Sequence, residues 1–285
     1  APRLRQFSRR SWSSFWAAAA IGEEERRQRV ASQDDIGDVA VTDIDQRDIR
    51  DTLAPIWHTK ADTARKALNR LAIVLRHAAA LGLDVDLQAT DKAKALLGKS
   101  RHVAKHIPAM AWADVSCFFA SLSEPTLTHL ALRLLVLTGV RSNPLRHIRL
   151  EQIEGNIWTV PGENMKGRKG VTEAFRVPLS TDAQRVIDLV RPHARNGYLF
   201  SNTRGGVISD MTLSRHMARR GLEARPHGFR TSLRTWLAEA TDAPHEVAEA
   251  MLAHTVDSGV VRAYRRTDFL EQRRALAERC DLPPS

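Results

Sequence analysis

The chain has 285 residues, of which 43% are hydrophobic and 27% charged, a composition typical of one large or two ordinary globular domains. It contains no run of about 18 apolar residues long enough for a membrane span, and its two cysteines, Cys117 and Cys280, exclude a disulfide framework and a multi-cysteine zinc site. Lysine and arginine outnumber aspartate and glutamate by 43 to 33, and the net charge of +10 favours a polyanionic partner such as a nucleic acid.

The first third of the sequence predicts helices. We expect a short helix to follow Asp45 and to end by Pro55, and a longer one to begin near Asp62 and to stop near Gly82. The apolar residues of the longer helix recur on one face, at Leu68, Leu71, Leu75 and Ala78. Its remaining surface carries cations that we expect to contact DNA, namely Arg65, Lys66 and Arg70.

A basic stretch without acidic residues follows, from residue 92 to residue 105. We predict a linker over residues 92–107 that joins a helical domain, residues 1–91, to a second domain, residues 108–285. A solvated helix face explains the composition of this stretch equally well. Three of its cations, Lys99, Arg101 and Lys105, are expected to contact DNA and are called the linker cations below.

The second domain is predicted to mix helices with a small sheet. Leu130, Leu134 and Leu137 share one helical face, which leads into Thr-Gly-Val-Arg ending at Arg141. Alternating residues 157–160, a Pro-Gly turn signal and residues 175–179 predict two strands of an antiparallel hairpin. Further helices are expected over residues 182–190, 229–240, 246–252 and 269–279. The fold class is therefore mainly α with a small antiparallel sheet, preceded by an all-α domain.

Two familiar cofactor motifs are present only in part. Residues 162–169 resemble a phosphate loop, but Arg168 stands where that motif requires lysine and Lys169 where it requires serine or threonine. Residues 245–249 begin like a zinc-protease helix, but Glu249 replaces the second histidine ligand. We therefore expect neither a metal nor another cofactor.

Five short motifs of the second domain occur in a characteristic order. They are Leu-Thr-Gly-Val-Arg ending at Arg141, Met-Lys ending at Lys166 with Arg-Val-Pro-Leu-Ser at 176–180, His227-x-x-Arg230, Leu-x-His ending at His254, and the final Tyr264. In their order and residue types, these motifs resemble those in the catalytic domain of the tyrosine recombinases, the phage integrase family. The resemblance covers roughly residues 108–285. More loosely, residues 36–57 and the helix after them resemble the core-binding domain of prophage-type integrases.

The resemblance implies a role for each of these side chains at a DNA phosphate. Arg141 and Arg230 would clamp the scissile phosphate, since guanidinium groups offer fixed, permanently charged donors, and His254 would add another donor. Tyr264 would attack the phosphorus and form a 3′-phosphotyrosyl bond. A second strand's 5′ hydroxyl would reverse that step.

The resemblance also implies the proton transfers. Lys166 would protonate the departing 5′ oxygen, and His227 would assist the tyrosine as a base or a positioning donor. Lys169 and Arg168 remain rivals of Lys166, and Tyr198 is the one competitor of Tyr264 because the chain has two tyrosines.

Several alternatives stay open at this point. A helix cap is an alternative role for His227 and a buried core histidine for His254, although the family resemblance outweighs both. The chain also departs from the family twice, with Pro144 at the position of a supporting acid and Ala253 at the position of a glycine. Because of the first departure, the sequence does not identify which carboxylate supports the site.

The activity that the resemblance implies is site-specific DNA recombination that integrates and excises a mobile element. A type IB topoisomerase-like nicking and resealing enzyme is an alternative, and a non-catalytic DNA-binding regulator on the same scaffold is another. The expected partners are double-stranded DNA, three further copies in a homotetramer, and accessory DNA-bending or directionality factors. Residues 269–282 would form an amphipathic helix that packs on a neighbouring protomer or on its own domain. We expect a nucleoid-associated bacterial cytoplasmic protein, with an arm-binding domain preceding Ala1.

Overall fold

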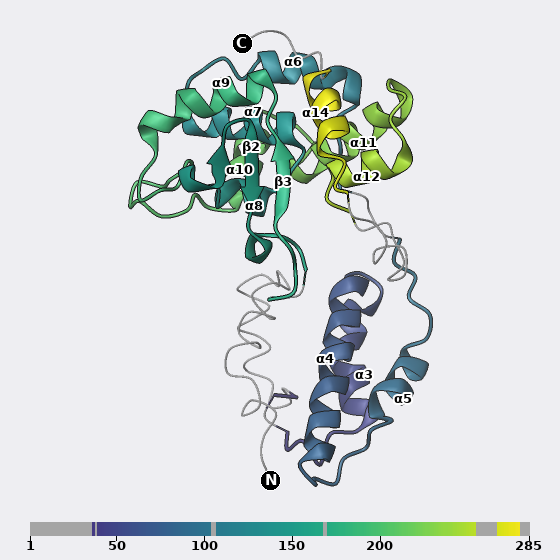
Figure 1. Ribbon diagram of the computed structural model, residues 1–285. Coiled ribbons are helices and arrows are strands. Elements are labelled where there is room, and N and C mark those ends of the chain that lie inside the picture. The colour runs from purple at the N-terminus through teal and green to yellow at the C-terminus, as the bar shows by residue number, and fades with distance from the viewer. Residues whose placement is uncertain (1–35, 38, 104–106, 168–169, 255–266, 280–285) are drawn as a thin grey trace. The chain divides into compact units, whose positions relative to one another are not determined.

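The computed structural model describes residues 36–37, 39–103, 107–167, 170–254 and 267–279 (Figure 1). The chain divides into two compact units, residues 1–105 and residues 106–285, and each is considered by itself. Within these described ranges, every helix is too short or too polar to cross a lipid bilayer.

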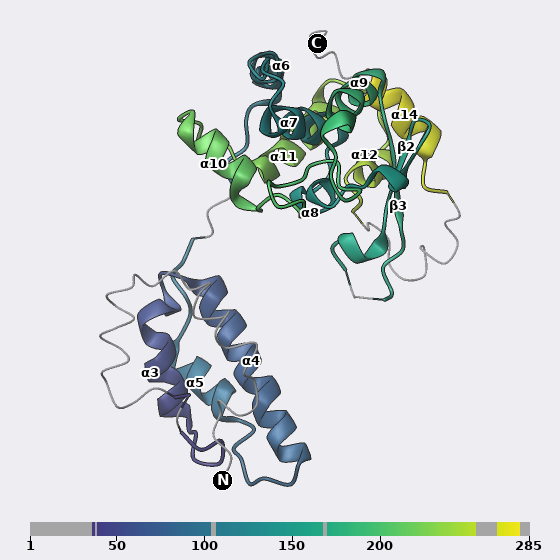
Figure 2. The same cartoon turned by 90° about the vertical axis from the view of Figure 1, so that its left-hand side faces the viewer.

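The described part of the first unit contains three helices, α3 (Gln46–Trp57), α4 (Ala61–Ala80) and α5 (Ala89–Leu97), which lie side by side in both views (Figures 1 and 2). Asp45 caps α3, because its carboxylate accepts from the backbone N–H groups of residues 47 and 48. The apolar face predicted for α4 packs into the core at Leu71, Leu75 and Ala78. The all-α character expected of this part is confirmed.

Two boundaries in this unit differ from the sequence prediction. Helix α3 continues past Pro55 to Trp57, because Ile56 and Trp57 are buried and the Trp57 Nε1–H donates to the Gly98 carbonyl at 2.9 Å. Residues 92–97, which we expected in the linker, form the last part of α5. The small side chains of Ala89 and Ala93 let this helix pack closely on α3.

The second unit is organised around the buried helix α7 (Leu127–Thr138), which packs against α9 (Thr181–Val190) and α10 (Met211–Arg219). Its sheet has the order β1 (Ile153–Glu154), β2 (Ile157–Val160) and β3 (Phe175–Pro178), antiparallel throughout, with Trp158 opposite Val177. The mainly α fold with a small antiparallel sheet is therefore confirmed (Figure 2).

The other described elements of this unit are mostly short. They comprise α6 (Val115–Ala120), α8 (Ser142–Arg146), α11 (Phe229–Glu239) and α12 (His245–Met251), with 3₁₀ turns η2 (Trp112–Asp114), η3 (Leu150–Gln152), η4 (Gly162–Asn164), η5 (Arg191–His193) and η6 (Pro226–Gly228). Helices α11 and α12 form a small second core together with the last helix, α14 (Leu270–Glu278).

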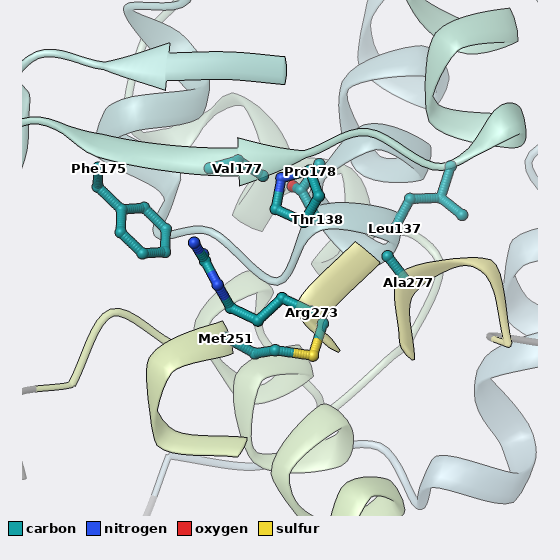
Figure 3. Close-up of a pocket in the computed structure, with 8 residues that line it drawn as sticks. All are labelled: Leu137, Thr138, Phe175, Val177, Pro178, Met251, Arg273 and Ala277. Carbon is teal, nitrogen blue, oxygen red and sulfur yellow. The ribbon is translucent and has the colours of Figure 1, made fainter. Parts of the chain in front are cut away.

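A buried arginine fastens α14 to the domain that carries it. Arg273 is 1% exposed, and its guanidinium lies 4.9 Å from the ring of Phe175 on β3 (Figure 3). The guanidinium donates to the Arg176 carbonyl at 2.8 Å and to the Asp268 carboxylate at 3.3 Å, while Asp268 also pairs with the Arg176 side chain. In this single chain α14 thus packs on its own domain, one of the two arrangements predicted. Exchange between protomers stays a prediction.

Candidate active site

The first arginine of the site follows a tight turn at the end of α7. Gly139 ends the helix in the left-handed region (φ +61°), and a Cβ at this position would collide with the Leu233 side chain. Val140 is buried, and Arg141 then begins α8 as its N-cap residue in extended backbone. Burial lowers the pKa of Arg141 from its ordinary value, but a guanidinium stays charged at neutral pH. The glycine turn therefore delivers a fixed cation to the C-terminal end of α7.

The second arginine, Arg230, is held by the ends of two helices. Its side chain donates from Nη1 to the Gly139 carbonyl at 2.6 Å and from Nη2 to the Leu252 carbonyl at 2.5 Å. These residues are the C-caps of α7 and α12, where the helix dipoles favour a positive charge. Arg230 is only 6% exposed; burial, helped by the charge of Arg141 and opposed by Glu249, lowers its pKa to about 10.

His254 follows α12 through a Schellman turn. The His254 N–H bonds the Glu249 carbonyl at 3.0 Å and the Ala253 N–H bonds the Ala250 carbonyl at 3.1 Å, with Ala253 in the left-handed region (φ +49°). This conformation explains why the resemblance led us to expect glycine at position 253. The turn directs the imidazole toward Arg230, whose Nη2 lies 3.0 Å from His254 Nε2.

The carboxylate of Glu249 supports this histidine from the other side. Its Oε2 lies 2.8 Å from His254 Nδ1, and its Oε1 accepts from Arg234 Nε at 2.6 Å. Burial raises the pKa of Glu249, but the hydrogen bonds from Arg234 and His254 outweigh it, so the pKa lies below its ordinary value. Glu249 is therefore ionised at neutral pH.

This role of Glu249 was not predicted from the sequence. There, Glu249 was only the residue that disqualifies a zinc motif, and with Pro144 at the usual position of the supporting acid no carboxylate could be named. Pro144 is buried within α8. The sequence feature that could have indicated this role is the five-residue spacing between Glu249 and His254. A Schellman turn between them brings the two side chains close together.

His227 and Lys166 lie near the two arginines and His254. His227 belongs to the turn η6 directly before α11. Its pKa is lowered first by desolvation, then by the nearby positive charges of Arg230, Arg141 and Lys166, with a further contribution from His254. Lys166 is exposed just after η4, and the Asn143 side chain ties that loop to α8 through a 3.0 Å bond to the Asn164 carbonyl.

The structure thus brings together five of the six predicted catalytic residues, Arg141, Lys166, His227, Arg230 and His254. Tyr264 lies outside the described residues, as do Lys105 and the rival cations at positions 168 and 169. His254 is exposed rather than a core residue, so that alternative is wrong. The predicted DNA-contacting residues Arg65, Lys66, Arg70, Lys99 and Arg101 are all exposed, and Arg65 pairs with Asp62 at 2.9 Å.

The described residues contain no group of three or more histidine, cysteine, aspartate or glutamate side chains arranged to hold a metal ion. What the cluster offers instead is a set of N–H donors. Three hydrogen bonds to other described residues use three of the five N–H groups of Arg230, and two remain for a further acceptor. Donors and positive charge at one point suit an anion with several oxygens, such as a phosphate.

Two family models match the sequence: residues 114–271 match the phage integrase family, and residues 6–95 match the phage integrase central domain. The chain belongs to the phage integrase family. This confirms the family predicted from the five motifs, and the catalytic match includes Arg141, Lys166, His227, Arg230, His254 and Tyr264.

Similar proteins from phage and bacteria agree with this assignment. The integrase of Enterobacteria phage P4 is 27% identical, over 84% of this chain and 60% of that protein. Prophage integrase IntZ of Escherichia coli strain K12 is 29% identical, over 92% of this chain and 67% of IntZ. The chain thus spans about two thirds or less of the length of these relatives.

Among solved structures, the lambda integrase tetramer bound to a Holliday junction superposes with a TM-score of 0.61. It covers 91% of this chain and 79% of lambda integrase, at 18% sequence identity. At that identity the likeness establishes the fold alone. The small sheet, the buried α7 and the helices around them are therefore the integrase fold.

Proposed function

We propose that this chain is a site-specific DNA recombinase that cuts and rejoins strands through a 3′-phosphotyrosyl bond to Tyr264, and so integrates and excises a mobile element. The observation that carries the proposal is the cluster of Arg230, His254, Arg141, Lys166 and His227 around one point. Converging N–H donors and positive charge suit an anion with several oxygens, such as a phosphodiester.

The two arginines would stabilise the transition state. As the tyrosine oxygen attacks, negative charge grows on the non-bridging oxygens of the phosphate, and preorganised donors at those oxygens lower the barrier. Arg230 suits this role because two helix ends hold its guanidinium before DNA arrives. Arg141 enters from the neighbouring turn, and its charge reaches the same point.

Lys166 and His227 would move the protons. Lys166 sits on an exposed loop between β2 and β3, from which an ammonium can reach the leaving 5′ oxygen and give up a proton. The lowered pKa of His227 keeps its imidazole neutral at pH 7. A neutral imidazole can accept the proton of the attacking tyrosine or orient its hydroxyl.

The proposed partners follow from the same reading. Lambda integrase is a tetramer on a Holliday junction, which supports a homotetramer on double-stranded DNA here. Exchange of the C-terminal segment and accessory DNA-bending factors belong to the proposal as well, as does a place on the nucleoid of a bacterial cytoplasm. Exchange of α14 itself would require the buried Arg273 to leave the face of β3.

Replacing the nucleophile tests the proposed chemistry. Tyr264→Phe should bind duplexes from the chromosomal junctions that flank the gene as tightly as the wild type, but should form no covalent adduct on a denaturing gel. Tyr198→Phe is the matched control and should form adducts normally, since its ring packs beneath the Arg149 guanidinium at 4.7 Å.

Each result separates the proposal from its rivals. Binding without any adduct from the wild type would indicate a regulator. Adducts and plasmid relaxation without pairing of two DNA sites would indicate a topoisomerase-like enzyme. Adducts from Tyr264→Phe at the wild-type level would overturn the assignment of the nucleophile.

A further inference from the structure

We propose that Glu249 is a positioning residue of this site: its carboxylate holds the His254 ring with the proton on Nδ1 and balances the charge of that ring when DNA is bound. The inference rests on the proposed function, because the phosphate that His254 would meet is the one cut by Tyr264. The tautomer itself can be measured in the protein without DNA.

Glu249 is fixed at both carboxylate oxygens. Oε1 accepts from Arg234 of α11 at 2.6 Å, and Oε2 faces His254 Nδ1 at 2.8 Å. The Glu249 side chain is 15% exposed, so water competes weakly for either oxygen. His245, one turn earlier on α12, places its Nε2 3.9 Å from Oε1 and adds a weaker contact. The carboxylate is thus built into the junction of two helices.

The partners on the two sides of His254 specify one tautomer. An ionised carboxylate only accepts hydrogen bonds, so Nδ1 must carry a proton to bond Glu249. A guanidinium only donates, so Nε2 must present its lone pair to Arg230, 3.0 Å away. Both demands are met by the neutral ring with its proton on Nδ1.

Phosphate binding changes what the ring must do. A phosphate oxygen competes with Nε2 for the Arg230 donors, and His254 can contact that oxygen only if Nε2 gains a proton from water. The resulting imidazolium lies between two anions, the phosphate and Glu249. A carboxylate so placed keeps the ring oriented and balances its charge, as a carboxylate does for the histidine of a catalytic triad.

The tautomer is tested on the free, full-length chain by ¹⁵N NMR of labelled histidines, with the His254 signals assigned by their loss in His254→Gln. We expect the Nδ1-protonated pattern in the wild type and its loss in Glu249→Gln, whose amide cannot accept from both His254 and Arg234. Glu246→Gln, the same change on an exposed residue of α12, should leave the pattern intact. A wild-type ring protonated on Nε2 alone would overturn the inference.

The kinetic test measures the rate of adduct formation on the flanking-junction duplex. Glu249→Gln should slow it by roughly 10- to 100-fold, the range found when a group that orients a metal-bound histidine is removed, whereas Glu246→Gln should not change it. Arg234→Gln breaks the same ion pair but keeps the carboxylate at His254, so it should cost less than about 3-fold. An equal loss in Arg234→Gln and Glu249→Gln would make the effect structural and refute the inference.

A double-mutant cycle completes the test. In a His254→Gln background, Glu249→Gln should slow adduct formation by less than about 2-fold, because it acts through the ring that is already absent. If the rate losses of the two single variants multiply in the double variant, the inference is refuted. If the wild type forms no adduct at all, the proposed function fails, while the NMR measurement still decides whether Glu249 sets the tautomer.

Discussion

Replacing Gly139 by alanine should destabilise the catalytic domain through two separable effects. A non-glycine residue in the left-handed region costs about 1–2 kcal/mol, and displacing the terminal methyl of the half-buried Leu233 costs about 1 kcal/mol more, the low end of the cost of overpacking. The sum is about 2–3 kcal/mol. At roughly 2–4 °C per kcal/mol for a domain of this size, the unfolding temperature should fall by roughly 4–12 °C in calorimetry.

Gly155 provides a matched control for the backbone effect. It has a similar φ of +55°, but a Cβ there would meet no atom within 4 Å. Gly155→Ala should therefore cost about 1–2 kcal/mol, and the entropy that either change removes from the unfolded chain cancels in the comparison. In a Leu233→Ala background, the excess cost of Gly139→Ala should largely disappear. If Gly139→Ala costs no more than Gly155→Ala, the packing of this turn is not as described.

Four further predictions concern the site and the DNA. Lys166→Ala should slow cleavage of normal DNA by about 10²–10⁴-fold. The same variant should regain most of the rate on DNA with sulfur at the bridging 5′ position, because a thiolate leaves without an acid. Arg141→Ala should stay slow on both substrates. Neutralising the linker cations should make the plot of log affinity against log salt shallower by about 0.9 for each cation that contacts a phosphate; an unchanged slope would place them away from DNA. Because the pKa of His227 is lowered in the folded state, the unfolded chain takes up its proton first, so wild-type stability should fall faster than that of His227→Gln as the pH drops below the ordinary value of 6.5; parallel curves in urea denaturation would contradict this. Ala253→Gly should raise the free energy of unfolding by about 0.5–1 kcal/mol, because it relieves the left-handed strain.

Sequence patterns predicted the elements whose burial is periodic. Helix α9 and strand β2 were found within a residue or two because their side chains alternate between core and surface at a regular period. Helix α10 was missed, since its nine residues mix polar and apolar side chains and only Leu213 and Met217 are buried. The two-residue strand β1 carries too few residues for any pattern.

The candidate site was predictable where chemistry dictates residue type, and only there. Arg141, Arg230 and His254 were identified because their motifs resemble those of the tyrosine recombinases in order and residue type, and because guanidinium and imidazole groups supply the donors that a phosphate needs. The pairing of Arg230 with two helix-end carbonyls depends on how α7, α11 and α12 meet in space. No local spacing encodes that meeting.

The two hydrogen bonds from Arg230 to backbone carbonyls affect the order in which residues would be lost by mutation if the activity were no longer needed. Its guanidinium satisfies carbonyls at the ends of α7 and α12, so its loss would leave two buried acceptors unpaired, at about 1–3 kcal/mol each. Tyr264, in contrast, can become phenylalanine by losing a single oxygen. A lineage that no longer needed strand cleavage but still needed the fold should therefore lose Tyr264 long before Arg230. Inactivated copies of the gene should therefore include some that lack Tyr264 but still encode Arg230.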